Sequence, residues 1–346
     1  MNIMSDQKSI NYYETNQGAK IFQIPIQCFP GLKGWVYLVL VEDDHEKYRV
    51  LIDSGSGYGE ANQDLENGLQ IASDMCGEEI NLSSLTHILI THGHIDHFGG
   101  LFYIRPNTLA KVGIHELDLR NLTNYEERLT IISSRLNQFL IEAGIKPERR
   151  QQLIEMYRFP KSLHQSIKVD FSFEANGMQL GPFKMMHVPG HCAGQVVIQL
   201  HDILFSGDHI LERTTPHQSP EHLTLNTGLG HYFESLDRVS RCTNGVRLTL
   251  GGHEGPINDL PGRISDIKTM HIQRLKKVEA LLSEPHTIEE TSLELFGEVH
   301  GYNVLLALEE AGAHVEYLYQ RGVLEIQNLE ELGRDSQPVA IYYHRL

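Results

Sequence analysis

Paired cysteines, long apolar runs and an excess of basic residues are all absent from this chain of 346 residues. The four cysteines, Cys28, Cys76, Cys192 and Cys242, are scattered and form no C-x-x-C motif. That spacing fits neither a disulfide framework nor a zinc finger, and a reducing cytoplasm is the simplest interpretation. The longest apolar runs, such as residues 35–41 (WVYLVLV), are far shorter than the roughly 20 residues that a membrane span needs.

We expect no targeting segment at the start of the sequence. Residues 1–18 contain neither the apolar core nor the cleavage-like site of a signal peptide, and we expect a short polar tail there. Hydrophobic residues make up 40% of the chain and charged residues 21%, which is typical of a globular protein and excludes a disordered one. We therefore expect a cytoplasmic protein of about two domains that makes no contact with a membrane.

Basic residues are outnumbered by acidic ones. The chain has 29 Lys and Arg against 45 Asp and Glu, a net charge of -16 at pH 7. Tight binding of nucleic acid depends on clustered Lys and Arg that contact phosphates. We therefore expect a small-molecule substrate rather than a nucleic-acid partner, although the net charge does not exclude a local basic patch.

Histidine, by contrast, is abundant, with 20 residues. Four side chains able to bind a metal lie within six residues of the segment THGHIDHFGG: His92, His94, Asp96 and His97. A strand is expected over residues 86–90 and a helix over 95–103, so the turn between them can direct all four side chains to one point. Imidazole and carboxylate groups are the ligands that zinc, manganese and iron prefer.

Further metal-ligand candidates follow other expected strands. His191, Asp208 and His253 each stand directly after a glycine, where the backbone can turn tightly and approach an ion. Any one of them alone is more often an ordinary loop residue. The dense cluster at 92–97 together with three separate glycine-flanked ligands is hard to produce by chance, and it predicts a site for two metal ions.

These motifs resemble the metallo-β-lactamase-fold hydrolase superfamily over residues 20–261. The resemblance implies an α/β fold of the αβ/βα sandwich type, with the metal site at one edge of the two sheets. Asp53, in LIDSG, matches an aspartate that orients the metal loop, and Thr91 is a candidate to contact a ligand imidazole. His92, His94 and His191 match the ligands of the first metal, Asp96, His97 and His253 those of the second, and Asp208 the carboxylate that bridges both ions.

The expected cofactor is therefore a pair of divalent metal ions, with zinc favoured and manganese or iron as alternatives. Two such ions about 3.5–4 Å apart share a water and lower its pKa toward neutrality, and the resulting hydroxide is the nucleophile. Asp96 is the candidate catalytic residue, since it can orient that hydroxide and relay its proton. We expect cleavage of an ester, thioester or lactone bond. The alternatives are a metal-dependent ribonuclease or phosphodiesterase, and an iron-dependent redox enzyme.

Residues outside the motifs give weaker indications. Residues 116–157 look helical, with a break near 144–147, and an insertion at about 115–165 can arch over the cleft as a lid. Four basic residues near its end, Arg149, Arg150, Arg158 and Lys161, form either an anion-binding rim or a solvated helix face. His231 and Tyr232 are candidates to line the cleft, but Tyr232 is more simply a packing residue at the start of a helix.

We divide the chain into the tail at 1–18, a catalytic domain at 19–262 and a small helical module at 263–346. The module resembles the winged-helix-like extension of one branch of the superfamily, with separate helices expected at 303–311 and 314–320. From residue 266 to the end it has 7 Lys and Arg against 14 Asp and Glu. A winged helix that binds nucleic acid should be basic, so we expect the module to support the cleft or to form a homodimer contact.

Overall fold

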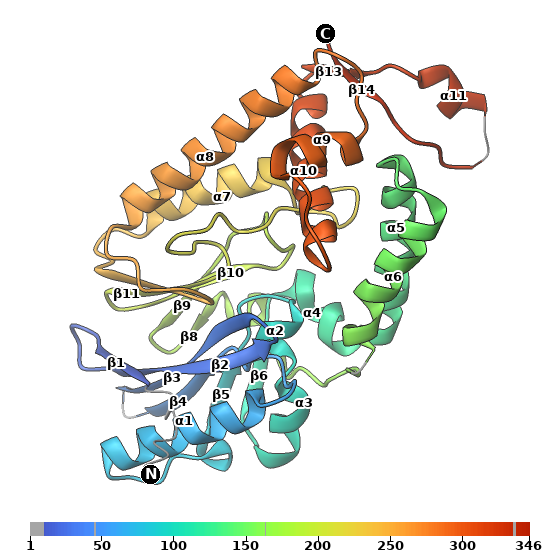
Figure 1. The fold of residues 1–346 in the computed structure, drawn as a ribbon. Coiled ribbons are helices and arrows are strands. Elements are labelled where there is room, and N and C mark those ends of the chain that lie inside the picture. Colours follow the sequence, from blue (N-terminus) through green and yellow to red (C-terminus); the bar gives the residue numbers. More distant parts are fainter. Residues whose placement is uncertain (1–9, 45, 163, 335–336) are drawn as a thin grey trace, which may run out of the picture.

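The computed structural model describes residues 10–44, 46–162, 164–334 and 337–346 (Figure 1). Two β-sheets face each other in the middle of the molecule, and helices cover the outer face of each sheet (Figure 1). This arrangement is the α/β fold, an αβ/βα sandwich, that the sequence motifs predict.

The first sheet has seven strands in the order β1-β2-β3-β4-β5-β6-β7. They are β1 (Asn11–Glu14), β2 (Lys20–Phe29), β3 (Leu32–Asp43), β4 (Glu46–Ile52), β5 (His87–Leu89), β6 (Lys111–Ile114) and β7 (Phe171–Ser172). Strands β1 to β4 pair antiparallel, whereas β4 to β7 pair parallel. The parallel half places the carboxyl ends of β4 and β5 at the same edge of the sheet.

The second sheet has five strands in the order β12-β11-β10-β9-β8. They are β8 (Gln179–Leu180), β9 (Phe183–His187), β10 (Val196–Leu200), β11 (Ile203–Gly207) and β12 (Leu248–Gly251). Only β11 and β12 pair parallel, so their carboxyl ends also lie together. The two sheets are joined at this edge, because the Val196 amide donates to the Thr91 carbonyl (2.9 Å) and the Trp35 amide to the Gly252 carbonyl (2.8 Å).

Helices occupy the outer layers and the connections. They are α1 (Ala61–Cys76), α2 (Ile95–Phe98), α3 (Leu101–Ile104), α4 (Glu116–Thr123), α5 (Tyr125–Glu142), α6 (Pro147–Lys161), α7 (Leu229–Cys242), α8 (Leu260–Leu281), α9 (Ile288–Phe296), α10 (Asn303–Gln320) and α11 (Leu329–Arg334). Short 3₁₀ turns lie at Leu82–Ser84, Arg105–Asn107 and Glu174–Asn176. No helix in the described ranges combines the length and apolar character needed to cross a bilayer.

Helix α1 lies very close to the first sheet because of one small residue. Gly68 is buried on the inner face of α1, and a Cβ atom there would lie 2.3 Å from Cγ2 of Ile24 in β2. Any larger residue would therefore push the helix away from the sheet and open the apolar layer between them.

Apolar side chains fill three layers. Between the sheets, Val39 and Val50 of the first sheet pack in one cluster with Ile198 and Phe205 of the second. A second cluster lies between the first sheet and helices α1 and α3. The third lies outside the second sheet, where Leu204 packs in one cluster with side chains of α5, α7, α8 and α10.

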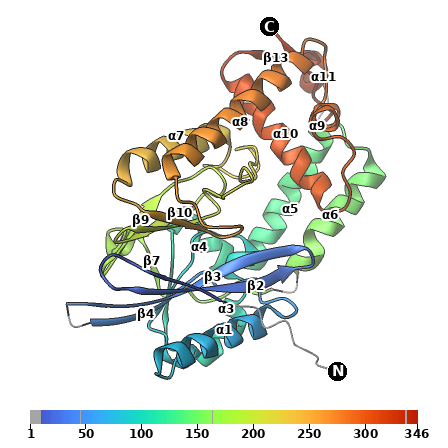
Figure 2. The same ribbon diagram turned by 60° about the vertical axis from the view of Figure 1, so that its left-hand side comes forward.

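The C-terminal helices thus share a core with the second sheet (Figure 2). Helix α10 is one continuous helix, so the expectation of two helices at 303–311 and 314–320 is wrong. Gly312 stays helical because it packs closely: a Cβ there would lie 2.9 Å from Pro220 and 3.0 Å from Phe139. After α10 the chain forms a two-stranded antiparallel sheet from β13 (Leu324–Ile326) and β14 (Tyr343–Arg345).

Two other expectations need correction. Residues 11–14, which we placed in a polar tail, pair with β2 as strand β1, while residues 1–9 lie outside the described part of the chain. The helix expected over 95–103 is divided into α2 and α3 at Gly99 and Gly100. Cβ atoms at these glycines would lie 2.2 and 2.0 Å from the carbonyl oxygens of Ser56 and Ser54, so the chain passes the loop after β4 at backbone distance.

Candidate metal centre

Five segments bring side chains together at the joined edge of the sheets. Asp53 follows β4, residues 91–97 follow β5, and Asp208 and His253 follow β11 and β12. The loop after β9 supplies His191. All seven side chains predicted as metal ligands meet here, although they span more than 160 residues of sequence.

Three imidazoles form the first group. Nδ1 of His94 lies 3.0 Å from Nε2 of His92 and 3.0 Å from Nε2 of His191. Three nitrogens bound tetrahedrally to one zinc ion would lie about 3.3 Å apart, since a Zn–N bond is about 2.0–2.1 Å long. The spacing in the protein is close to this value, so the group fits a single metal ion.

Asp96, His97 and His253 form the second group. Oδ2 of Asp96 lies 3.3 Å from Nε2 of His253 and 3.7 Å from Nε2 of His97. Asp208 lies between the two groups, with Oδ2 3.8 Å from Nε2 of His191 and 3.4 Å from Nε2 of His253. Its carboxylate therefore faces both groups, as a bridging ligand must.

Unpartnered polar atoms provide a test of whether the site fits metal ions. Nε2 of His97 and Oδ1 of Asp208 are buried and have no hydrogen-bond partner among the described residues, although they lie only 3.4 Å apart. Buried polar atoms without a partner are costly unless something satisfies them. A Cβ at Gly252 would lie 2.4 Å from this Oδ1 and 2.5 Å from Cε1 of His97. The residues present therefore fit a two-metal site.

Asp53 and Thr91 hold the ligand loop in position. Oδ2 of Asp53 accepts a hydrogen bond from Nδ1 of His97 (2.8 Å) and another from Oγ1 of Thr91 (2.9 Å). Oγ1 of Thr91 in turn lies 3.1 Å from Nδ1 of His92. These contacts leave the Nε2 atoms of both imidazoles to face the centre, which is how outer partners usually orient metal-binding histidines.

Backbone carbonyls orient the two ligands from the second sheet. Nδ1 of His191 lies 2.7 Å from the carbonyl oxygen of His217, and Nδ1 of His253 lies 2.6 Å from that of Lys33. Both rings therefore donate from Nδ1, and each turns its Nε2 atom toward the centre.

Asp118 is a supporting residue that the sequence analysis missed. Its buried carboxylate accepts a hydrogen bond from the Gly93 amide (2.7 Å) and lies 3.2 Å from Sγ of Cys192. It thus connects the loop of His92 and His94 to the loop of His191. Burial raises the pKa of the Cys192 thiol well above its usual range, which agrees with a structural rather than a nucleophilic cysteine.

Helix α10 supports the same site from the other side. Oε2 of Glu310 accepts a hydrogen bond from the Gln218 amide (2.7 Å), and its Oε1 accepts one from Arg274 of α8 (2.5 Å). Nε2 of His217 lies 3.2 Å from the Leu306 carbonyl. Since the His217 carbonyl orients His191, two C-terminal helices help to position a metal ligand that is more than 80 residues away in sequence.

Burial and neighbouring charges set the protonation of the ligands. Burial lowers the pKa of His92 and His191, and that of His94 to about 3, so all three are neutral. Burial opposes ionisation of Asp96 and Asp208, but the facing imidazoles of His97 and His253 hold both carboxyl pKa values below the usual range. Against the effect of burial, the facing carboxylates raise the pKa values of His97 and His253 well above the usual range. A metal ion that binds to these two imidazoles must therefore displace their protons.

Tyr232 and His231 do not contribute to the groups of candidate ligand atoms. Tyr232 is fully buried in α7 and donates from its hydroxyl to the His209 carbonyl (2.9 Å), as a packing residue would. His231 pairs with Glu221 (3.0 Å) in a separate hollow beside Arg321. The structure therefore does not bring either residue to the ligand set.

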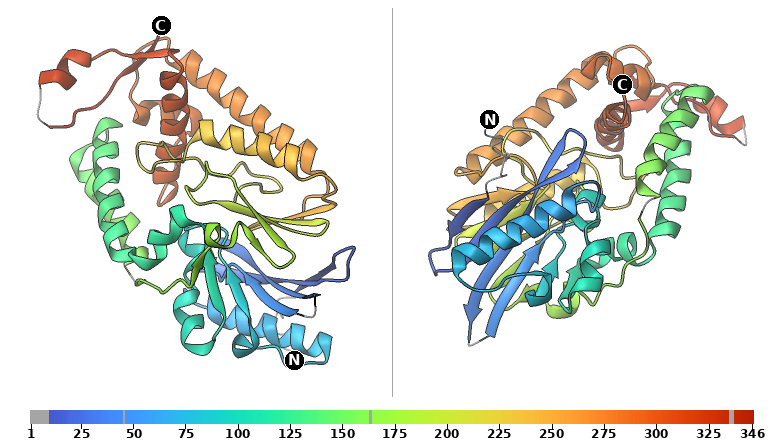
Figure 3. Two further views of the ribbon diagram at one scale, coloured as in Figure 1. Left: turned by 180° about the vertical axis from the view of Figure 1, so that it is seen from behind. Right: turned by 60° about the horizontal axis from the view of Figure 1, so that its bottom comes forward.

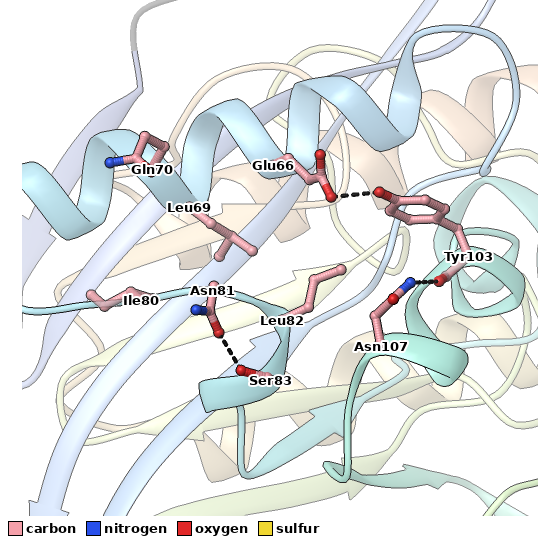
Figure 4. A pocket seen from close by; sticks show the side chains of 9 residues that line it. All are labelled: Glu66, Leu69, Gln70, Ile80, Asn81, Leu82, Ser83, Tyr103 and Asn107. Atoms are coloured by element: carbon pink, nitrogen blue, oxygen red, sulfur yellow. Dashed lines mark hydrogen bonds between the residues drawn. The ribbon is translucent and has the colours of Figure 1, made fainter.

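A further hollow of about 350 Å³ lies beneath α1 on the first sheet's side of the molecule (Figure 4). Its polar groups satisfy one another: Tyr103 donates to Glu66, Asn107 to the Tyr103 carbonyl (3.0 Å) and Ser83 to Asn81 (2.7 Å). None of the metal-binding groups found in the described residues lines it. The metal centre is thus the better candidate for a catalytic site.

Comparison with known proteins agrees with this geometry. The family model of the metallo-beta-lactamase superfamily matches residues 30–284. The "Probable metallo-hydrolase YqjP" of Bacillus subtilis (strain 168) is 22% identical over 301 residues, 84% of this chain and 89% of that protein. An atrochrysone carboxyl ACP thioesterase of Claviceps purpurea (strain 20.1) is 25% identical over 263 residues, 73% of this chain and 64% of that protein.

Among solved structures, a metallo-beta-lactamase family protein of Thermus thermophilus has the same fold. It matches with a TM-score of 0.70 and 24% identity, over 94% of this chain and 98% of that one. The family model spans well over half of the sequence and includes all seven ligand positions. The chain belongs to the metallo-beta-lactamase superfamily.

Proposed function

We propose that the protein is a hydrolase that uses two divalent metal ions to cleave an ester, thioester or lactone bond in a small substrate. The observation that carries this proposal is the placement of Asp208 between two groups of three ligand atoms. Zinc is the favoured metal, since three nitrogen ligands with one shared carboxylate suit it. Iron and manganese use similar ligands.

When bound, two such ions supply a water of lowered pKa and polarise the oxygen of the substrate carbonyl. The chain's own contribution is to hold the ligands rigidly and to manage a proton. Asp96 is partly open to solvent, with 15% of its side chain exposed, and is ionised at neutral pH. We assign it the orientation of the attacking water and the acceptance of its proton.

Several features support a small substrate in a reducing compartment. All four cysteines are free, so the fold does not depend on disulfides. The net charge of -16 disfavours RNA or DNA as the substrate. The relative from Claviceps purpurea is named as a thioesterase, and this places thioesters first among the substrates to test.

The test is a substrate panel on protein reconstituted with zinc, manganese or iron(II). We expect hydrolysis of short thioesters and p-nitrophenyl esters, about two metal ions per chain, and no cleavage of single-stranded RNA. Cleavage of RNA without ester hydrolysis would contradict the proposal in favour of a nuclease. A coloured iron protein that consumes oxygen would contradict it in favour of redox chemistry.

A further inference from the structure

A lysine and two tyrosines meet where α6 ends and α10 begins. Nζ of Lys161, the last residue of α6, donates a hydrogen bond to the hydroxyl of Tyr302 (3.1 Å). The same ammonium lies 4.0 Å from the centre of the Tyr157 ring and 5.3 Å from that of Tyr302. We call these three residues the lysine-tyrosine cluster. The aromatic rings hold the ammonium in place without neutralising its charge.

The ammonium of Lys161 forms no ion pair within the part of the chain that the structure describes. Glu309 of α10 lies within reach of the lysine's charge; it accepts a hydrogen bond from Ser219 (3.0 Å) and lies 3.6 Å from Nε2 of His217. Burial raises the pKa of Glu309 to about 7. A large share of Glu309 is therefore neutral at physiological pH. In that form it does not compete with another anion for the charge of Lys161.

The cluster is tethered to both sides of the metal centre. Three residues after Lys161, His164 contacts the Ser56 carbonyl (3.0 Å) in the loop whose Ser54 amide donates to the His97 carbonyl (2.7 Å). On the other side, Glu309 lies 3.6 Å from Nε2 of His217, and the His217 carbonyl orients His191. Figure 3 shows α5 and α6 on one flank of the sandwich next to α10.

Charge and exposure relate the cluster to Asp96 and to solvent. Burial, with the charges of Glu309 and Asp96, raises the pKa of Tyr302, so Asp96 is near enough for its field to reach this hydroxyl. Tyr302 is 38% exposed, and Lys161 and Tyr157 are half-buried. A solute can therefore reach the cluster.

Two other basic residues of the expected rim do not join the cluster. Arg149 pairs with Glu289 (2.9 Å), and Arg158 is exposed one helical turn before Lys161. A half-buried ammonium beside a phenol hydroxyl is a stronger site for an anion than an exposed arginine, because the surroundings compete less with the charge.

We propose that the lysine-tyrosine cluster binds a carboxylate of the substrate whose scissile bond lies at the metal centre. This inference rests on the proposed function and adds a substrate class to it, namely carboxylate-bearing thioesters or esters. The Lys161 ammonium pairs with the carboxylate, and the Tyr302 hydroxyl donates a hydrogen bond to it. The carboxylate can belong to the acyl group or to the leaving thiol.

Matched thioesters test this proposal on metal-loaded protein. S-succinyl-N-acetylcysteamine carries the carboxylate on the acyl group, the butyryl thioester of 3-mercaptopropionate carries it on the thiol, and S-butyryl-N-acetylcysteamine carries none. We expect a higher kcat/KM for one of the charged substrates than for the neutral one. We call the kcat/KM for the charged substrate divided by that for the neutral substrate the charge-preference ratio. In Lys161→Met, this ratio should fall about tenfold through a higher KM for the charged substrate, which is the loss typical of one hydrogen bond to a charged group. Tyr302→Phe should lower it in the same direction.

Arg158→Met is the matched control, because it removes a positive charge from the same helix outside the cluster. It should keep the wild-type ratio. An equal ratio in wild type and Lys161→Met would overturn the proposal, and so would an equal loss in Arg158→Met, which would indicate a general field effect.

Binding without turnover separates this inference from the proposed function. If wild type hydrolyses none of the thioesters, the proposed function fails, while calorimetric titration with succinamate and butyramide still tests the subsite. We expect succinamate to bind about tenfold more tightly than butyramide in wild type and to lose this advantage in Lys161→Met. Equal binding of the two amides to wild type would overturn the subsite itself.

Discussion

Two clusters of histidine and carboxylate in this protein look alike in residue content but differ in chemistry. At the metal centre, Nε2 of His97 and Oδ1 of Asp208 are buried without partners among the described residues. The second cluster, His271, Glu310 and His314 of α8 and α10, is equally buried and compact. Its ligand atoms have hydrogen-bond partners among the described residues, except Nε2 of His271.

The hydrogen bonds of the second cluster show this occupation. Nδ1 of His271 lies 3.2 Å from Nε2 of His314, and Nδ1 of His314 donates to the Glu310 carbonyl (2.7 Å). Both carboxylate oxygens of Glu310 are taken, one of them by Arg274. Compact geometry is therefore not enough for a metal site. Free lone pairs and the absence of a competing cation decide, and the second cluster is a packing network.

Removing candidate ligands from each cluster should have the largest effect and tests the difference between the clusters most directly. His94→Ala and Asp208→Ala should each lower hydrolysis by more than about 10³-fold, because the water of lowered pKa is lost, while circular dichroism still shows a folded protein. His271→Gln should bind as many metal ions as wild type, measured by elemental analysis. Full turnover in either ligand variant, or fewer ions in His271→Gln, would show that the roles of the clusters are wrongly assigned.

Coupling between the clusters gives a smaller effect. Glu310→Gln should weaken zinc binding by about tenfold, since outer partners of metal ligands typically contribute 10–100-fold and Glu310 holds the Gln218 amide beside the carbonyl that orients His191. Competition with a chelator measures the affinity. Glu316→Gln, which alters the exposed end of the same loop at Glu221 and His222, is the control, and an equal loss there would contradict a specific route through Glu310.

Acid should reduce the contribution of the second cluster to the free energy of unfolding. Burial lowers the pKa of His271 to about 2 and that of His314 to about 3, so both are neutral in the folded protein. Below about pH 6.5 the unfolded chain takes up protons that the folded protein refuses, and the free energy of unfolding falls by up to about 1.4 kcal/mol per pH unit for each histidine. The contribution of each neutral histidine to the free energy of unfolding is fully present above about pH 6.5.

Urea unfolding at pH 7.5 and pH 5.5 checks this expectation. The decrease in unfolding free energy should be smaller in His271→Gln than in wild type, because one titrating group is gone. An identical decrease in both proteins would place the acid sensitivity elsewhere.

The smallest expected effect concerns Glu309, which is neutral below and ionised above about pH 7. Ionised Glu309 competes for the charge of Lys161, so KM for a carboxylate-bearing thioester should rise a few-fold from pH 6 to pH 8. The groups that face Glu309 are Ser219, His217 and, through its charge, Lys161. Glu309→Gln should flatten this pH dependence, and a KM that rises equally in the variant would exclude Glu309 as its cause.

The convergence of the seven candidate ligands could be predicted from the sequence, because each follows a strand and several stand next to glycine. Strand ends in a sandwich meet at one edge, so local patterns such as THGHIDHFGG carry spatial information. Resemblance to a family supplied the pairing of these ligands into two groups. The fold class followed from the same motifs.

Supporting residues could not be found in this way. Glu310 lies on the largely buried helix α10 and Lys161 at the end of α6, and their partners are 92 and 141 residues away. Tyr232 is buried in α7, as the simpler of its two interpretations, a packing residue, predicted. Contacts between helices depend on the direction in which each helix packs, and one sequence does not reveal this.

The apolar layer that the second sheet shares with α8 and α10 joins the sandwich and the C-terminal helices into one folding unit. Arg263, in the first turns of α8, donates to the Leu211 and Thr214 carbonyls, only a few residues after the Asp208 ligand. A fragment ending at residue 262 would retain every metal ligand and yet leave that layer in water, with the loop before His217 untied. Heating should therefore unfold the sandwich and its C-terminal helices in one transition. A chimera that joins either part to the corresponding part of a relative would also need a redesigned apolar layer between the two.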